Sequence, residues 1–405
     1  MKRKYKQSFD VLLCGPLCDI DVSYGVYLKR FGLRVCIARM KKNGVEEKIN
    51  FPENFLNDID TNEILHLSSP CELISLARRS RIIITNTSYF GLVITWRWFF
   101  RKILQIPPVI NIPTGFDFSE WLEAKSIFGW FIRYFSRTCE INQFFGAPYP
   151  HMVKNIYKYK IKNVIFNGYP YYLPEVERKS DEKSSGSLIF FHPSHLDFKA
   201  TIIGENRNSS KGNDRFIKAF IRALHNGLDA VCVILYRGVD REIAKDFIEK
   251  SGFSDRFVWK PHLNREQLAE EMLKADIIID QFDIGGLGSI AIEAMSLGKP
   301  VMIYTQSNCM KIAYSTPPPV INAHSEEDIY QQLKNYNDRN ELIRLGEEAR
   351  RWIYQNHYWK KCLEQFMFFY TLLTDHQVID YGWQTNPYDK ATIFQDNEAG
   401  EGSIY

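Results

Sequence analysis

Several features that mark particular classes of protein are missing from this chain of 405 residues. Its eight cysteines form no CxxC pair, and no group of histidines and cysteines has zinc-finger spacing. No run of about 18 uncharged apolar residues occurs, so we expect no membrane-spanning helix. The formal net charge of +3 is small for this length and argues against a general nucleic-acid-binding protein.

The N-terminus also lacks the pattern of an export signal. Its first ten residues, MKRKYKQSFD, are basic but lead into a short strand pattern rather than a signal-peptide apolar region. Cysteines such as Cys14 and Cys232 lie in apolar, strand-like runs, which indicates buried and reduced thiols. We therefore expect a cytoplasmic protein.

The length and composition of the chain predict more than one domain. Hydrophobic residues make up 45% of it, as in an ordinary globular protein, and 405 residues are too many for one core. The run from Pro174 to Ser187, PEVERKSDEKSSGS, is polar and charged, as linkers are. We predict a first domain over residues 1–173, a second over 187–373 and a polar tail over 374–405.

Strand patterns alternate with helical patterns in both halves. The first half opens with a strand at Phe9–Cys14, a helix at Val22–Phe31 and a strand at Leu33–Ala38. In the second half, apolar residues follow a helical period over Asp214–His225, and Ile277–Asp280 is an apolar strand. This alternation predicts doubly wound α/β domains, whose ligands bind at the carboxyl ends of the strands.

The segment from Ala275 to Tyr304 carries the clearest chemistry. A strand ends at Asp280, a loop with three glycines follows, and a helix begins near Ser289. Glycines allow the backbone to approach a ligand, and the free N–H groups of a helix start favour a phosphate. Glu293 lies one turn into that helix, where its carboxylate can accept two hydrogen bonds from a ribose diol. A plain glycine-rich turn with a solvated glutamate is the alternative.

Four short motifs resemble the GT-B glycosyltransferases, chiefly the retaining group called family 4. They are Gly288 with Glu293-Ala294-Met295, then Gly298 with Pro300-Val301, then Lys211-Gly212 before the helix DRFIKA, and finally Phe166-Asn167-Gly168-Tyr169-Pro170. The resemblance covers most of residues 160–370, while residues 1–160 match in architecture alone. It implies a GT-B fold, in which two Rossmann-like doubly wound domains face a cleft, and the activity of a hexosyltransferase.

The resemblance also implies roles for individual residues. Lys211 would pair with the donor diphosphate, Glu293 would hold the ribose, and the amides of Gly288 and Ser289 would contact a phosphate. With His195, which follows a strand end, Lys211 and Glu293 are the candidate catalytic residues. The candidate donor-binding residues are Gly15, Arg207, Arg237, Asp283, Gly285, Gly286, Leu287, Gly288, Ser289 and Glu293.

The chain departs from the family at one informative position. The family usually has a second glutamate eight positions before Glu293, where this chain has Gly285. Asp283 is a candidate replacement. The phrase Gly285-Gly286-Leu287-Gly288-Ser289 also resembles the GGxGS phrase of inverting enzymes of the same fold, so retention and inversion of configuration both stay open.

Neither a metal nor another cofactor is expected. Asp19-Ile20-Asp21 fits a DxD pattern that binds manganese in the other major glycosyltransferase fold, but an aspartate at a helix start is a simpler explanation. His192 and His195 flank a strand end, and a structural histidine is more common than a functional one. The GT-B fold normally stabilises a diphosphate with side chains and helix dipoles.

Two segments combine aromatic and basic residues. Residues 94–104, ITWRWFFRKIL, and residues 130–137, WFIRYFSR, are typical of helices that lie on a membrane surface. Ordinary helices that cover the sheet, with long basic side chains reaching to water, are the alternative.

The sequence therefore predicts an enzyme that moves a sugar from a nucleotide-sugar donor to a glycan or lipid-linked acceptor. We expect it to act in cell-surface polysaccharide biosynthesis, at the inner face of a membrane. Two alternatives stay open: a nucleotide-sugar epimerase or hydrolase of the same fold, and a non-catalytic relative that binds a sugar nucleotide.

Overall fold

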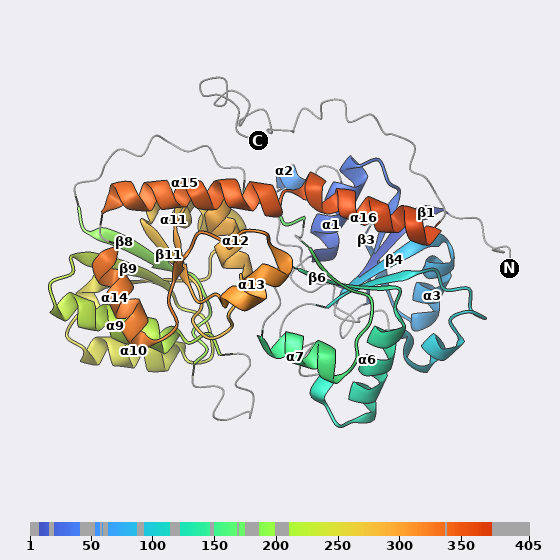
Figure 1. The fold of residues 1–405 in the computed structure, drawn as a ribbon, viewed down its shortest axis with the longest axis horizontal. Helices are drawn as coiled ribbons and strands as arrows, with labels where there is room; N and C mark the ends of the chain where they lie inside the picture. The colour runs from blue at the N-terminus through green and yellow to red at the C-terminus, as the bar shows by residue number, and fades with distance from the viewer. Residues whose placement is uncertain are drawn as a thin grey trace, which may run out of the picture.

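Two parallel β-sheets with helices packed around them form the molecule (Figure 1). The computed structural model describes residues 8–15, 20–40, 53–56, 59, 64–86, 93–113, 122–145, 150–167, 170–174, 186–198, 210–336 and 338–374. Most of the predicted linker and of the predicted tail therefore lies outside the described residues.

The first sheet has seven strands in the order β3-β2-β1-β4-β5-β6-β7, and its paired strands are parallel. Its strands are β1 (Phe9–Cys14), β2 (Val35–Met40), β3 (Ile64–Leu67), β4 (Ser80–Asn86), β5 (Val109–Ile112), β6 (Ile141–Phe145) and β7 (Val164–Asn167). The helices of this half are α1 (Ile20–Arg30), α2 (Glu53–Leu56), α3 (Pro70–Arg78), α6 (Ile127–Thr138) and α7 (Pro150–Lys158), with the 3₁₀ helix η3 (Thr95–Phe100).

The second sheet has six strands in the order β10-β9-β8-β11-β12-β13, again with parallel pairs. Its strands are β8 (Leu188–His192), β9 (Ala230–Leu235), β10 (Phe257–Lys260), β11 (Ile277–Ile279), β12 (Val301–Ile303) and β13 (Ile321–Asn322). The helices are α9 (Asn213–His225), α10 (Arg241–Lys250), α11 (Arg265–Lys274), α12 (Ser289–Ser296), α13 (Ser307–Ala313), α14 (Glu326–Asn335), α15 (Arg339–Asn356) and α16 (Trp359–Thr374), with the 3₁₀ helix η5 (Ser254–Arg256).

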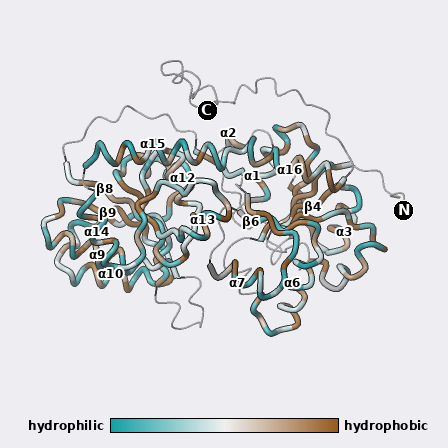
Figure 2. The backbone as a smooth tube through the Cα atoms, in the orientation of Figure 1, coloured by the Kyte–Doolittle hydropathy of each residue, from teal (hydrophilic) through white to brown (hydrophobic). Residues whose placement is uncertain are grey.

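Short apolar runs form the strands because both faces of each sheet are covered. All three residues of β11 are buried, as are the three of β12, and such continuous apolar runs are typical of parallel strands. Figure 2 shows hydrophobic residues concentrated on the strands, with polar residues on the outer helices. Capping boxes begin two of the helices, at Asn264 for α11 and at Ser325 for α14.

The aromatic and basic pattern predicts a helix over residues 94–104, where the structure has the short 3₁₀ helix η3 directly after the helical residues Val93 and Ile94. Only Thr95–Phe100 forms it, and turns follow. Trp98 is buried against α6, where its Nε1 donates a hydrogen bond of 2.8 Å to Thr138 Oγ1. One indole therefore anchors the segment, and its neighbours Phe99 and Phe100 remain exposed.

The last two helices connect the halves. Helix α15 runs beside the second sheet, and α16 continues along the same side to the first (Figure 1). Trp359 of α16 stacks on Tyr27 of α1 with ring centroids 5.2 Å apart, and Phe366 lies edge-on to Tyr24 at 6.2 Å. The C-terminal helix thus belongs to the core of the first half, although it follows the second half in sequence.

Candidate functional site

The candidate site lies where the strand order of the second sheet reverses. Strands β9 and β10 extend from one side of β8, and β11 to β13 extend from the other. In doubly wound sheets, the carboxyl ends of the strands at such a switch point bind the ligand. At this point the backbone of Lys211 connects the loop that follows β8 with the loop that follows β11. Its N–H donates to Asp197 O at 2.8 Å, and its carbonyl accepts from Phe282 N at 2.7 Å.

Hydrogen bonds between buried polar side chains hold the loops at this edge of the sheet. Asn213 Nδ2 lies 3.0 Å from His192 Nε2, and Ser194 Oγ donates to Asp280 Oδ1 at 2.6 Å. Burial lowers the pKa of His192 to about 4, so its ring is neutral at pH 7. Burial also raises the pKa of Asp280, and the positive charge of Lys211 opposes that rise.

Three basic side chains converge above this framework. Burial lowers the pKa of Arg237, and its Nε has no hydrogen-bond partner among the described residues. His195 is half exposed, and its pKa is lowered first by burial and then by the charges of Arg237 and Lys211. A half-buried guanidinium with a free Nε donor, which shares its neighbour His195 with the ammonium group of Lys211, is suited to a multiply charged anion.

The glycine loop holds the start of α12 open to solvent. Gln306 N donates to Gly285 O at 3.0 Å, and Gln281 Nε2 donates to Gly286 O at 2.6 Å, so both carbonyls point into the protein. Gly288 gives α12 no N-cap side chain, Ser289 in its first turn is exposed, and the backbone of Ala291 hydrogen-bonds to the carboxylate of Asp280. The other N–H groups of this helix start, the exposed hydroxyl and the helix dipole are suited to a phosphate.

Gly288 is required by a close approach. A Cβ atom at this position would lie 2.8 Å from Asp280 Oδ2, which has no hydrogen-bond partner among the described residues. The carboxylate of Asp280 therefore lies next to Gly288, the N-cap residue of α12.

Glu293 faces the other end of this region and is only 4% exposed. Its Oε1 accepts hydrogen bonds from Tyr171 OH at 2.9 Å and from Arg265 Nη1 at 2.8 Å. Burial raises the pKa of Glu293, and Arg265 and Tyr171 oppose that rise. A hydrogen bond with Ser289 likewise opposes the raised pKa of Tyr171, so the tyrosine joins Glu293 to the start of α12.

The other candidate residues lie in different surroundings. Asp283 Oδ1 pairs with Arg215 Nη2 at 2.6 Å, which engages the carboxylate considered as a replacement for the missing glutamate. Leu287 is half-buried beside the glycines. Gly15 ends β1 in the first sheet with φ of 118°, a conformation that favours glycine. Arg207 lies outside the described residues.

The DxD pattern is only partly described, because Asp19 lies outside the described residues. Asp21 forms a buried ion pair with Arg39, with Oδ1 to Nη2 at 2.7 Å, and both side chains are 2% exposed. A structural partner therefore engages Asp21. Within the described ranges, no group of three or more histidines, cysteines, aspartates and glutamates is placed to hold a metal ion.

Sequence reasoning missed several residues of this region. Tyr171 and Arg265 carry no motif, and they reach Glu293 across 122 and 28 positions of the chain. Asp280 was visible as a polar residue at the end of an apolar strand, a pattern that marks the binding edge of a parallel sheet. Only the fold brings these side chains together.

Comparison with known proteins identifies the second half of the chain. Residues 189–352 match the family model of glycosyl transferases group 1. No curated protein sequence matches the chain.

Solved structures resemble the chain over nearly its whole length. The Anabaena protein Alr3699/HepE in complex with UDP and glucose has 12% identity and a TM-score of 0.64, over 89% of this chain and 99% of that one. A glycosyltransferase from Rickettsia africae has 15% identity and a TM-score of 0.60, over 92% and 100%. Sucrose-phosphate synthase from Thermosynechococcus elongatus has 12% identity and a TM-score of 0.60, over 91% and 100%.

The solved structures confirm the predicted GT-B fold of two doubly wound domains, and the family match over residues 189–352 supports the predicted class of enzyme, a glycosyltransferase. The assignment of individual residues to the donor stays a prediction, which the geometry makes specific.

Proposed function

We propose that this glycosyltransferase, whose second domain belongs to the glycosyl transferases group 1, transfers a hexose from a uridine diphosphate sugar to a glycan or lipid-linked acceptor. The observation that carries the proposal is the convergence of Lys211, Arg237 and the open start of α12 at the switch point of the second sheet. The uridine donor is suggested by HepE, which has been solved with UDP and with UDP-glucose.

The proposed mechanism uses electrostatic stabilisation of the leaving diphosphate. Lys211, Arg237 and the amides of Gly288 and Ser289 oppose the negative charge that grows when the glycosidic bond to the diphosphate breaks. Glu293 holds the ribose diol of the donor. In this scheme His195, whose lowered pKa favours the neutral ring, contacts a phosphate or accepts a proton. No metal is required in this scheme, because cationic side chains and the helix dipole take its place.

The acceptor side is assigned to the first domain. Exposed apolar residues gather on η3, on the turn after it and on α6; we call them the apolar face, and they are Phe99, Phe100, Ile103, Ile127, Phe128 and Trp130. Phe99 stacks on Trp130 at 5.9 Å between ring centroids, which joins the two elements. Lys102, Lys125 and Arg137 are exposed on the same segments.

This apolar face supports contact with a membrane surface, where a lipid-linked acceptor would be found. The apolar face contains only part of the predicted membrane-surface segment 130–137, because Phe131, Ile132 and Phe135 of that segment are buried in the core. None of the helices in the described part of the chain has the length and apolar composition needed to cross a bilayer. We propose a peripheral location at the cytoplasmic face, in the assembly of a cell-surface polysaccharide.

A donor panel tests the proposal. Thermal unfolding is measured with UDP-, GDP- and TDP-sugars, because a ligand that binds only the native state raises the unfolding temperature. Products are then analysed with and without a lipid-linked or glycan acceptor. A UDP-sugar that stabilises the protein and is consumed only with acceptor supports the transferase. Conversion without acceptor would indicate an epimerase or hydrolase, and binding without any conversion would indicate a non-catalytic relative.

A further inference from the structure

The carboxylate of Glu293 is held from one side only. Tyr171 OH and Arg265 Nη1 both donate to Oε1, at 2.9 and 2.8 Å, and neither bond uses Oε2. The guanidinium carbon of Arg265 also lies 5.9 Å from the centre of the Tyr171 ring. The two donors therefore fix the orientation of the carboxylate and leave Oε2 for another hydrogen-bond donor.

These two donors also favour the charged form. Burial alone raises the pKa of Glu293, and the charge of Arg265 is the largest opposing cause, followed by the hydrogen bond from Tyr171. A protonated carboxyl group would lose acceptor capacity and could not bind both hydroxyls of a diol. The hydroxyl of Tyr171 therefore affects the charge as well as the direction of this group.

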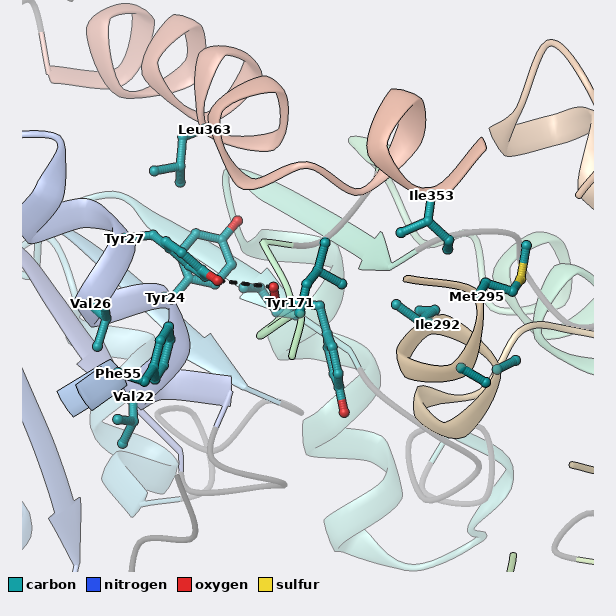
Figure 3. Packing of buried hydrophobic residues seen from close by; sticks show 14 of the residues in the cluster. Val22, Tyr24, Val26, Tyr27, Phe55, Tyr171, Ile292, Met295, Ile353 and Leu363 are labelled. Atoms are coloured by element: carbon teal, nitrogen blue, oxygen red, sulfur yellow. Dashed lines mark hydrogen bonds between the residues drawn. The ribbon is translucent and has the colours of Figure 1, made fainter. Parts of the chain in front are cut away.

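Tyr171 is fixed at its other end by the first domain. Tyr27 OH donates to Tyr171 O at 3.2 Å, and Tyr27 itself stacks on Trp359 of α16. Figure 3 shows Tyr171 between the side chains of α1 and those of α12, with the bond from Tyr27 drawn as a dashed line. One residue thus contacts the core of the first domain through its backbone and Glu293 through its hydroxyl.

We infer that Tyr171 and Arg265 are positioning residues for the donor: they direct Oε2 of Glu293 towards the ribose diol of a nucleoside diphosphate. The inference rests on the proposed function, in which Glu293 binds the ribose. It adds that recognition of the diol depends on a tyrosine anchored to the first domain.

The test compares UDP with 2′-deoxy-UDP, which lacks one hydroxyl of the diol. Both ligands are titrated calorimetrically into the wild type, Tyr171→Phe and the control Tyr172→Phe, which removes the hydroxyl of the neighbouring tyrosine. A hydrogen bond to a charged group is worth roughly a tenfold change in affinity or more. We expect Tyr171→Phe to bind UDP about tenfold more weakly, to lose most of the preference for UDP over 2′-deoxy-UDP, and to need a higher pH for binding.

The controls separate this inference from the proposed function. Tyr172→Phe is expected to keep the preference and the pH profile of the wild type. If Tyr171→Phe does not fold, Arg265→Lys gives the same readouts, because its ammonium group cannot reproduce the guanidinium geometry. An unchanged preference and pH profile in a folded variant would overturn the inference alone. A wild type that binds neither ligand would overturn the proposed uridine donor, and the inference with it.

Discussion

Single residues of the second domain bury charge, and each charge is balanced close to where it lies. Glu293 is paired with Arg265, and Asp280 is balanced by the charge of Lys211 and by the hydroxyl of Ser194. Two buried atoms, Nε of Arg237 and Oδ2 of Asp280, have no hydrogen-bond partner among the described residues. A guanidinium with a free donor at this edge of the sheet is suited to bind an anion.

His357 makes stability depend on pH. It is buried, its Nε2 lies 2.9 Å from Tyr314 OH, and burial lowers its pKa from 6.5 to about 4. Between pH 4 and 6.5 the unfolded state therefore binds more protons than the folded state. The stability that comes from the neutral ring is complete above pH 6.5 and is lost as the pH falls towards 4.

We predict that His357→Gln removes this dependence. In the wild type, the histidine should lower the free energy of unfolding by about 3 kcal/mol over the full range, since one pKa unit corresponds to about 1.4 kcal/mol. Urea unfolding of both proteins at a series of pH values measures the difference between their free energies of unfolding. The contributions of the other titrating groups cancel in this difference. Parallel stability curves for the two proteins would contradict the prediction.

At the scale of single residues, the sequence predicts that the glycine loop lets the backbone approach a ligand. The structure gives a second reason for glycine at position 288, because a Cβ atom there would lie 2.8 Å from Oδ2 of Asp280. The roles of Tyr171 and Arg265 were beyond prediction, because a hydrogen bond across 122 positions depends on how the domains pack.

Among the elements, those of the second domain match their sequence patterns closely. The helix predicted at Asp214–His225 differs from α9 by one residue, and the strand predicted at Ile277–Asp280 differs from β11 by one residue. Strong apolar periodicity and clear caps make such helices predictable. In the first domain, β6 and α7 had no prediction, because INQFF mixes polar with aromatic residues and α7 has only nine residues.

The capping box of α11 leads to a prediction about function. Asn264 accepts from Gln267 N at 2.9 Å and so fixes the turn that carries Arg265. We expect Asn264→Ala to cost about 1 kcal/mol of stability and also to raise the KM for the donor, because Arg265 loses its fixed position next to Glu293. Urea unfolding and initial-rate kinetics measure the two effects.

A second capping box in the same domain supplies the control. Ser325 caps α14, where it accepts from Asp328 N at 3.1 Å, and no candidate site residue lies on that helix. Ser325→Ala is expected to lose a similar free energy while the KM for the donor stays unchanged. Equal changes in KM for both variants would mean that the effect is a general loss of stability.

At the scale of the whole molecule, the chain crosses twice between its two sheets. The segment around Tyr171 leads from the first to the second, and α16 returns to the first (Figure 1). There Trp359 packs on Tyr27. The alternation of strand and helix patterns predicts the fold of each half, because it is a local property of the sequence. The return of α16 depends on aromatic contacts between distant segments, which local pattern does not reveal.

The apolar face of the first domain predicts binding to lipid vesicles. Ile103 and Ile127 are 77% and 87% exposed, which makes them the strongest candidates for insertion between lipids. We expect the double variant Ile103→Glu with Ile127→Glu to lose at least tenfold in affinity for vesicles of phosphatidylglycerol and phosphatidylcholine, measured by co-sedimentation.

A matched double variant lies on the second domain. Ile243 and Phe247 of α10 are 41% and 43% exposed, and Ile243→Glu with Phe247→Glu is expected to bind vesicles as the wild type does. If both pairs reduce binding equally, the apolar face is not the membrane contact. A wild type that stays in the supernatant would contradict the proposed location.

The most direct test of the central claim is calorimetric titration of UDP into Lys211→Ala. Lys218→Ala is the control, since Lys218 lies on α9, seven positions after Lys211, and its partner among the described residues is Asp214, in a surface pair at 3.0 Å. We predict that Lys218→Ala binds UDP as the wild type does and that Lys211→Ala binds it at least tenfold more weakly, with no change in its affinity for uridine, which lacks the phosphates. Wild-type affinity of Lys211→Ala for UDP would contradict the account.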